Sequence, residues 1–231
     1  MATKPPVYAR INWRQRLLAA LRSTSALVAA AYVLKANSVK TSALEADIRR
    51  LETERALTVA NVKRLASYTA LITLTARRFG AFSDDLTGMA QTSIAGGVAL
   101  GLDAARDMAG VQFGATETFV MLGWNQPSAA QLARLTGYVE SAAWRASASA
   151  FGRSAADVLS NVILTGVARG QGPRTIAATM RRALDTVPRV WAETTVRTAQ
   201  IWGYRTAAHE SYRANPDLVR GWIWTAALDS R

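Results

Sequence analysis

The chain has 231 residues, of which 50% are hydrophobic and 19% are charged, so it can bury an apolar core and is not a disordered chain. Its 28 basic and 16 acidic residues leave a net charge of +12, which favours anionic partners such as nucleic acid or an acidic protein surface. It contains no cysteine and one histidine, which excludes disulfides, thiolate metal sites and His/Cys zinc clusters. We therefore expect a folded basic protein without a metal ion, a cofactor or a small-molecule substrate.

The positive charge is concentrated at the two ends of the chain. Residues 1–64 contain twelve bases and four acids, residues 65–150 five and six, and residues 151–231 eleven and six. The basic start is followed by an apolar run, but this run spans only the ten residues Ser25–Leu34, too short for a bilayer. We expect neither a leader peptide nor a membrane-spanning helix. The candidate contacts to a polyanion or a protein in this part are Arg10, Arg14, Arg16 and Arg22.

The first half of the chain predicts an extended arm followed by helices. Pro5 and Pro6 indicate the arm, and the apolar spacing predicts helices over about 13–35 and 42–57 and a third near 65–79. Ser83, followed by two aspartates, is typical of a helix start, because acids are stabilised near a helix N-terminus.

Two glycines four residues apart, Gly97 and Gly101, fit two alternatives. They allow two helices to approach closely, or the pair Gly96-Gly97 forms a turn. The periodicity then weakens over 111–127. We take this segment as a linker between a basic arm and helical region, 1–110, and a second helical module, 128–231.

The second module predicts helices over 128–150, 154–169, 173–184 and 189–214, the last ended by Asn215-Pro216. Gly170 is expected to stop one helix, and Pro173 to begin the next, which explains this glycine-rich segment without a bound phosphate. The alternating tail Val219–Thr225 predicts a strand. The expected fold class is therefore mainly α, a multi-helix protein with long helices and a short C-terminal β element.

The last helix carries an arginine every eight residues, at Arg189, Arg197, Arg205 and Arg213. Eight residues leave a rotation of about 80° per step, so these side chains spiral around the helix and cannot form one phosphate-reading stripe. Some should contact protein and others solvent. On the same helix Ala199, Gly203 and Ala207 share a face flat enough for another helix, and His209 is expected to be an ordinary surface or interface residue.

The C-terminal third contains two stretches, VLSNVILTGVARGQGPRTIAATMRRAL and VRTAQIWGYRTAAHESYRANPDLVRGWIWTAALDSR, that form one recognisable pattern. Over about 80 residues this pattern resembles the phage head morphogenesis family, the Mu F-like minor head proteins. The family has glutamate where this chain has Ala199, and its pattern continues past the final arginine into two cysteines. The matching positions are Gly166, Gly172, Arg197-Thr198, Tyr204, Tyr212, Trp222, Trp224, Asp229 and Arg231.

The resemblance implies a minor structural protein of a tailed-phage head, located in the virion at the portal vertex and capsid interior, and in the host cytoplasm during assembly. The portal protein and other head proteins would be its partners, with packaged double-stranded DNA as a second contact. Arg197 and Arg205 are candidates for portal or DNA contact, and the structural or interface positions of the motif would be Gly166, Gly172, Trp222, Trp224 and Asp229. No catalytic residue is expected, and a membrane is not an expected partner. The alternatives are a nonspecific DNA-binding protein and the N-terminal part of a Mu F-like fusion whose effector enzyme lies beyond Arg231.

Overall fold

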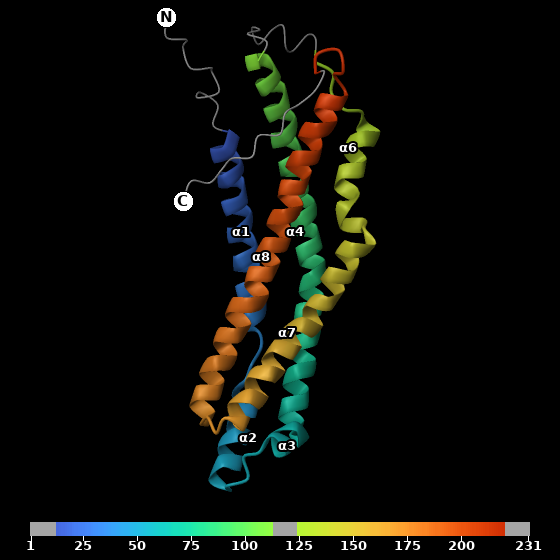
Figure 1. Ribbon diagram of the computed structural model, residues 1–231. Helices are drawn as coiled ribbons and strands as arrows, with labels where there is room; N and C mark the ends of the chain where they lie inside the picture. The colour runs from blue at the N-terminus through green and yellow to red at the C-terminus, as the bar shows by residue number, and fades with distance from the viewer. Residues whose placement is uncertain (1–12, 113–123, 220–231) are drawn as a thin grey trace, which may run out of the picture. The chain divides into compact units, whose positions relative to one another are not determined.

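The computed structural model describes residues 13–112 and 124–219, nearly all of them helical (Figure 1). The elements in chain order are α1 (Trp13–Asn37), α2 (Ser42–Thr53), α3 (Val59–Arg64), α4 (Ala66–Gln112), α6 (Ala129–Thr136), the 3-10 helix η2 (Gly137–Glu140), α7 (Ala142–Ala168) and α8 (Pro173–Arg213). This confirms the mainly α prediction.

The prediction of a C-terminal β element is wrong within the described residues. No strand occurs in residues 13–112 or 124–219, and at Val219, where the strand was expected to begin, the amide donates to Asn215 O at 2.8 Å. This bond returns over four residues as in a helical turn, so the chain is not extended there. The rest of the predicted strand lies outside the described residues. The fold class is α throughout the described part.

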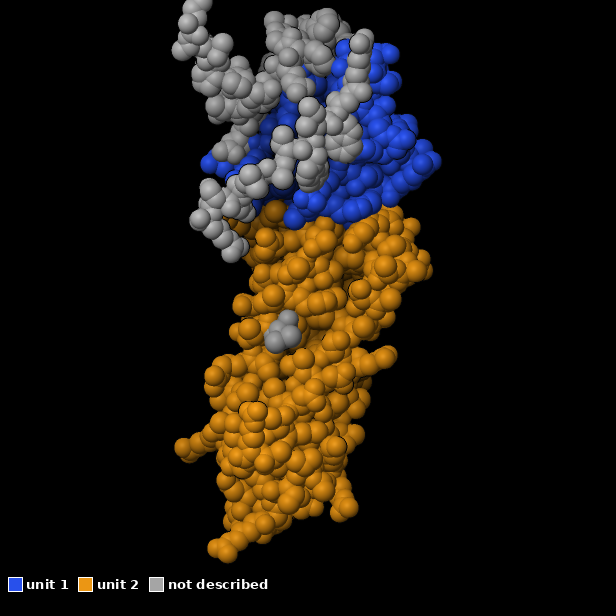
Figure 2. Space-filling view, viewed as in Figure 1, with its two compact units in different colours: residues 1–18, 94–136, 200–231 blue, residues 19–93, 137–199 orange. Residues whose placement is uncertain are grey.

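The chain folds into two compact units, each assembled from separate segments (Figure 2). Unit 1 contains residues 1–18, 94–136 and 200–231, and unit 2 contains residues 19–93 and 137–199. The predicted division around 111–127 stays a prediction, since residues 113–123 lie outside the description. Each unit combines segments from both sides of that boundary.

Aromatic side chains from four helices form the core of unit 2. Tyr32 of α1 stacks on Phe79 of α4 at 5.3 Å between ring centroids and meets Phe82 edge-on at 5.9 Å. Phe151 of α7 contacts both phenylalanines and stacks on Trp191 of α8 at 4.7 Å. Such ring pairs add to the hydrophobic stabilisation that their burial already gives.

A proline inside α8 explains a polar contact in this core. Pro188 has no amide hydrogen, so it cannot donate to the carbonyl of Leu184, four residues earlier. The hydroxyl of the fully buried Tyr32 donates to this same Leu184 carbonyl. A side chain of α1 therefore supplies the hydrogen bond that the helix itself cannot make, and α8 continues through the proline. The predicted break between 184 and 189 is wrong for this reason.

Close helix contact in unit 1 depends on glycine. A Cβ on Gly97 of α4 would lie 2.3 Å from Gln200 O of α8, and one on Gly101 would lie 2.3 Å from Tyr204 O. From the other side, a Cβ on Gly203 would lie 2.8 Å from Ile94 O. Real side chains do not come so close to a backbone, so only glycine fits at these three positions. The close-approach alternative for Gly97 and Gly101 is confirmed, as is the flat face containing Gly203.

A buried asparagine closes unit 1 at the end of α8. The Asn215 side chain accepts from Asn125 N at 2.7 Å and donates to Asn125 O at 2.9 Å and Ser211 O at 2.8 Å. Beside it, Trp124 donates through Nε1 to Ser211 Oγ at 3.2 Å and meets Tyr212 edge-on. The prediction that the last helix ends at Asn215-Pro216 is confirmed, because α8 ends at Arg213.

Several helix boundaries differ from the predictions. The helix predicted to start at Ser83 does not start there, since Ser83 lies inside the 47-residue α4 and its hydroxyl donates back to Gly80 O at 2.6 Å. α2 ends at Thr53, before Arg55, whose φ is +57°. The predicted break near 150–154 is absent. The interruption instead precedes Ser141, whose hydroxyl accepts from Trp144 N at 3.1 Å and caps α7.

Candidate interaction surfaces

Three of the four basic residues predicted at the start of the chain lie on one helix. Arg14, Arg16 and Arg22 are all on α1 and exposed, whereas Arg10 lies outside the described residues. The Arg16 guanidinium sits over the Trp13 ring at 4.4 Å from its centroid, a cation–π contact. Among the described residues, neither Arg14 nor Arg22 forms an ion pair. Within the described part of the chain these two cations are therefore available to an anionic partner.

The arginines of α8 divide as their spiral spacing predicts. Arg189 is half-buried and pairs with Glu193 at 3.8 Å, and Arg213 is exposed and pairs with Glu210 at 3.4 Å. Arg197 and Arg205 are exposed and form no ion pair with any described residue. The expectation that some of these arginines face solvent is confirmed at Arg197, Arg205 and Arg213, whereas contacts with core partners or neighbouring subunits stay a prediction.

The glycine motif between α7 and α8 has a structural role. The Gly166 carbonyl accepts from Gln171 N at 2.9 Å, and Gly170 donates to Val167 O at 3.0 Å with a φ of +66°. This is the Schellman arrangement that ends a helix, and Pro173 then begins α8 as predicted. A Cβ on Gly172 would meet Glu52 Oε1 at an ordinary 3.6 Å. Trp222, Trp224 and Asp229 lie outside the described residues.

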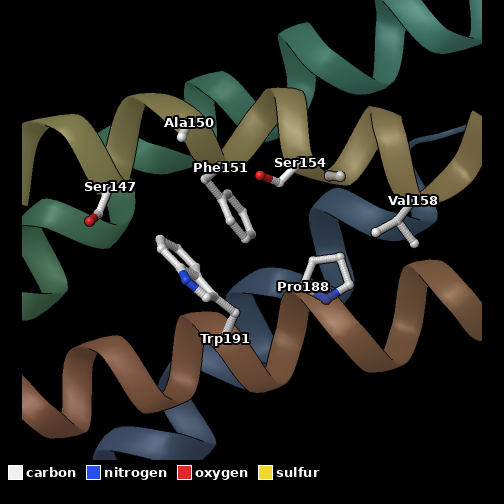
Figure 3. Close-up of a pocket in the computed structure, with 8 residues that line it drawn as sticks. Ser147, Ala150, Phe151, Ser154, Val158, Pro188 and Trp191 are labelled. Carbon is white, nitrogen blue, oxygen red and sulfur yellow. The ribbon is translucent and has the colours of Figure 1, made fainter.

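An apolar hollow between α7 and α8 was not predicted from the sequence. It encloses about 290 Å³ in unit 2 and is lined by Phe151, Val158, Pro188 and Trp191, with small residues and serines at its edge. Figure 3 shows the Phe151 and Trp191 rings projecting toward each other from the two helices. No titratable side chain lines it, so it can accept an apolar side chain but cannot perform acid–base chemistry.

A second, more polar hollow in unit 2 lies between α4 and the start of α7. It encloses about 760 Å³ and includes Asp84, Glu140 and Arg145. Trp144 donates through Nε1 to Thr87 Oγ1 at 3.1 Å at its wall. Asp84 faces this hollow, whereas the adjacent Asp85 pairs with Lys35 of α1 at 3.0 Å. The two aspartates therefore point to different surroundings and form no shared site.

The single histidine lies on α8, half-exposed, with its Nδ1 3.6 Å from Glu210 Oε1. This position agrees with an ordinary surface residue. No group of three or more potential metal ligands occurs among residues 13–112 and 124–219.

The outward side of α1 is unusually apolar. Among the described residues six large hydrophobic side chains are exposed, and Leu18, Leu27, Val33 and Leu34 of α1 are four of them. By length and composition α1 could cross a membrane, and 22% of its apolar stretch is buried. The sequence prediction considered only the run Ser25–Leu34, whereas the whole helix satisfies this criterion. Signal sequences and helices from soluble cores satisfy it too, so the finding does not assign a membrane role.

Compared with protein-family models, curated proteins and solved structures, the chain gives no match. The family resemblance is therefore carried by the sequence motif alone.

Proposed function

We propose that this chain is a minor structural protein of a tailed-phage head, which binds the portal protein and neighbouring head proteins and contacts packaged DNA as a secondary partner. The observation that carries the proposal is a sequence motif, whose residues follow one another in the family's order from Gly166 through Arg197-Thr198 to the tryptophan-rich end. The surfaces of the protein support it, since they offer apolar and cationic groups for binding. The role is one of assembly rather than catalysis.

The geometry of α8 is consistent with docking to another protein. Arg197 and Arg205 are each exposed and unpaired among the described residues. Either cation can bind an acidic side chain on a protein surface, because guanidinium binds carboxylate in a planar, two-point manner.

Direct binding tests the assembly role. The portal protein of the same phage would be purified and mixed with the chain, and the mixture separated by sedimentation. We expect co-sedimentation with portal rings, weakened when Arg197 and Arg205 are both changed to glutamate and retained when the exposed Arg174 is changed instead. Failure of the unmodified chain to bind the portal protein, at low salt as well as at physiological salt, would rule out the portal role.

Nonspecific DNA binding is a second candidate function, favoured by four arginines that form no ion pair with any described residue, Arg14, Arg22, Arg197 and Arg205. Phosphate contacts release counterions, so DNA affinity should fall steeply as salt rises. A salt-titrated binding assay with random-sequence duplex separates the candidates. Tight DNA binding without portal binding would favour the second function, and no DNA binding even at low salt would leave only the first.

A further inference from the structure

The outer face of α1 has the form of an unpartnered helix seam. Ser23, Leu27, Ala30 and Leu34 follow the i, i+4, i+7, i+11 spacing that places residues along one side of a helix, and we call these four the α1 seam. Leu27 is 66% exposed and Leu34 is 73% exposed. The twelve residues from Ser23 to Leu34 contain no charged side chain.

The opposite side of the same helix is already packed. Val28 and Tyr32 are fully buried in the core of unit 2, and Leu21 and Thr24 are nearly so. α1 is thus apolar on both sides, although the described residues cover only one of them. A helix that is apolar all round is normally buried all round, which indicates that something else covers the seam.

The seam is complementary to itself when a second copy is reversed. Its spacings of four, three and four residues read the same in both directions, so an antiparallel copy brings Leu27 opposite Ala30 and Leu34 opposite Ser23. Each leucine then fits beside a small residue, as knobs fit into holes in paired helices. A parallel copy would instead set leucine against leucine and alanine against alanine, which packs unevenly.

The charges at the ends of the seam select the same orientation. Arg22 precedes it and is exposed, and Lys35 follows it and pairs with Asp85 of α4 at 3.0 Å. The antiparallel arrangement sets Arg22 of one copy level with this pair in the other, where the Asp85 side chain is still 49% exposed and can accept a second cation. A parallel arrangement would bring Arg22 against Arg22, which is repulsive.

We propose that the α1 seam binds a second copy of this chain, antiparallel, about a two-fold axis between residues 28 and 29. A two-fold contact of this kind uses the same patch on both copies. The seam lies wholly within unit 2, and the inference does not depend on the head-protein function. Twelve helical residues extend about 18 Å, so the contact is smaller than a standard interface. We expect association only at roughly tens of micromolar or above.

Disulfide trapping tests the orientation, because the chain contains no cysteine of its own. Ser23→Cys and Leu34→Cys proteins, one carrying a larger tag, would be oxidised separately and as a mixture. We expect the mixed disulfide dimer only in the mixture, because residues 23 and 34 lie about 16 Å apart along the helix, beyond the reach of a disulfide. The exposed Thr53→Cys of α2 serves as the background control. Self-linked Ser23→Cys dimers, or no linkage above the control, would overturn the proposal.

Sedimentation equilibrium of the 231-residue chain tests how strongly it dimerises and which side chains are responsible. We expect Leu27→Asp to weaken dimerisation at least tenfold, and Val190→Asp, an equally accessible apolar position on α8, to leave it unchanged. Arg22→Glu should also weaken it, and Asp85→Arg in the same chain should restore it by reversing both charges. Circular dichroism confirms that each variant keeps its helices.

The same samples distinguish a bilayer from a second copy. If the chain stays monomeric at several hundred micromolar and floats with phosphatidylserine vesicles through Leu27, the seam covers a membrane surface and the proposal is wrong. Monomers that bind no vesicles also overturn it.

Discussion

The hydrogen bond from Tyr32 to Leu184 predicts a specific energetic coupling with Pro188. Replacing Tyr32 by phenylalanine keeps the ring in the core but removes the hydroxyl that donates to the Leu184 carbonyl in place of the amide hydrogen that Pro188 lacks. A buried carbonyl left without a partner costs about 1–3 kcal/mol, so Tyr32→Phe should lower the free energy of unfolding by about that amount.

The cost should depend on residue 188. In a Pro188→Ala chain the new amide can donate to the Leu184 carbonyl within the helix, so removing the Tyr32 hydroxyl no longer leaves that carbonyl unpaired. We expect Tyr32→Phe to cost about 0.5 kcal/mol or less in that background, since only a normal net hydrogen bond is then lost. The coupling energy should therefore be roughly 1 kcal/mol or more.

Urea denaturation of the four proteins measures the coupling, and the double-mutant cycle cancels the changes in packing that each substitution causes alone. Couplings below about 0.3 kcal/mol are not distinguishable from additivity. If Tyr32→Phe costs the same with proline and with alanine at position 188, the explanation for the unbroken α8 is refuted.

Three further predictions follow from the structure. Gly97→Ala should destabilise the protein by about 1–3 kcal/mol, because the new Cβ would collide with the backbone of α8. The adjacent Gly96→Ala should stabilise it by up to about 1 kcal/mol, because its Cβ would meet nothing within 4 Å and alanine favours the helix. Equal melting temperatures for the two variants would contradict this. Burial, with a smaller contribution from a nearby carboxylate, raises the pKa of Tyr32 above its ordinary value of 10.0. The stability that this residue contributes should be complete below that pH and should fall above it, because Tyr32 then ionises in the unfolded chain but not in the folded one. The difference between the urea midpoints at about pH 8 and pH 10.5 should therefore be smaller in Tyr32→Phe than in the unmodified chain. If Arg197 and Arg205 each contact a DNA phosphate, replacing either by alanine should reduce the slope of log affinity against log salt by roughly 0.9, and an unchanged slope would remove that residue from the DNA surface.

Local sequence signals were sufficient to predict those helix boundaries that the backbone of a single residue determines. Three helix boundaries follow from local backbone geometry. Gly170 adopts a positive φ and ends a helix, Pro173 lacks an amide hydrogen and begins one, and Asn215 precedes a proline and ends the last. These restrictions do not depend on residues distant in the sequence. The spiral of arginines on α8 likewise follows from helix geometry alone. The exposure of Arg197 and Arg205 agrees with it, although their proposed roles in portal or DNA contact stay predictions.

Other boundaries depended on partners distant in the sequence. Ser83 has the composition of a helix cap, but α4 continues through it because its hydroxyl bonds within the helix and its neighbours Phe79 and Phe82 are buried in the aromatic core. The hollow beside Trp191 could not be predicted, because it requires knowing that α7 lies against α8 at Phe151. Nor could the exposed side of α1 be separated from its buried side, since both are apolar.

The sequence by itself determined a basic, cysteine-free, helical chain and the places where its backbone must begin or end a helix. Only the tertiary structure decided whether Gly96-Gly97 forms a turn, whether Pro188 divides a helix and which side of α1 remains exposed. The physical reason is the same in each case. The sequence near a glycine, a proline or a leucine indicates only what that residue allows locally. The groups that decided these three cases come from remote segments: the Gln200 carbonyl beside Gly97, the Tyr32 hydroxyl on the Leu184 carbonyl, and the rings of Phe79 and Phe82 against one side of α1.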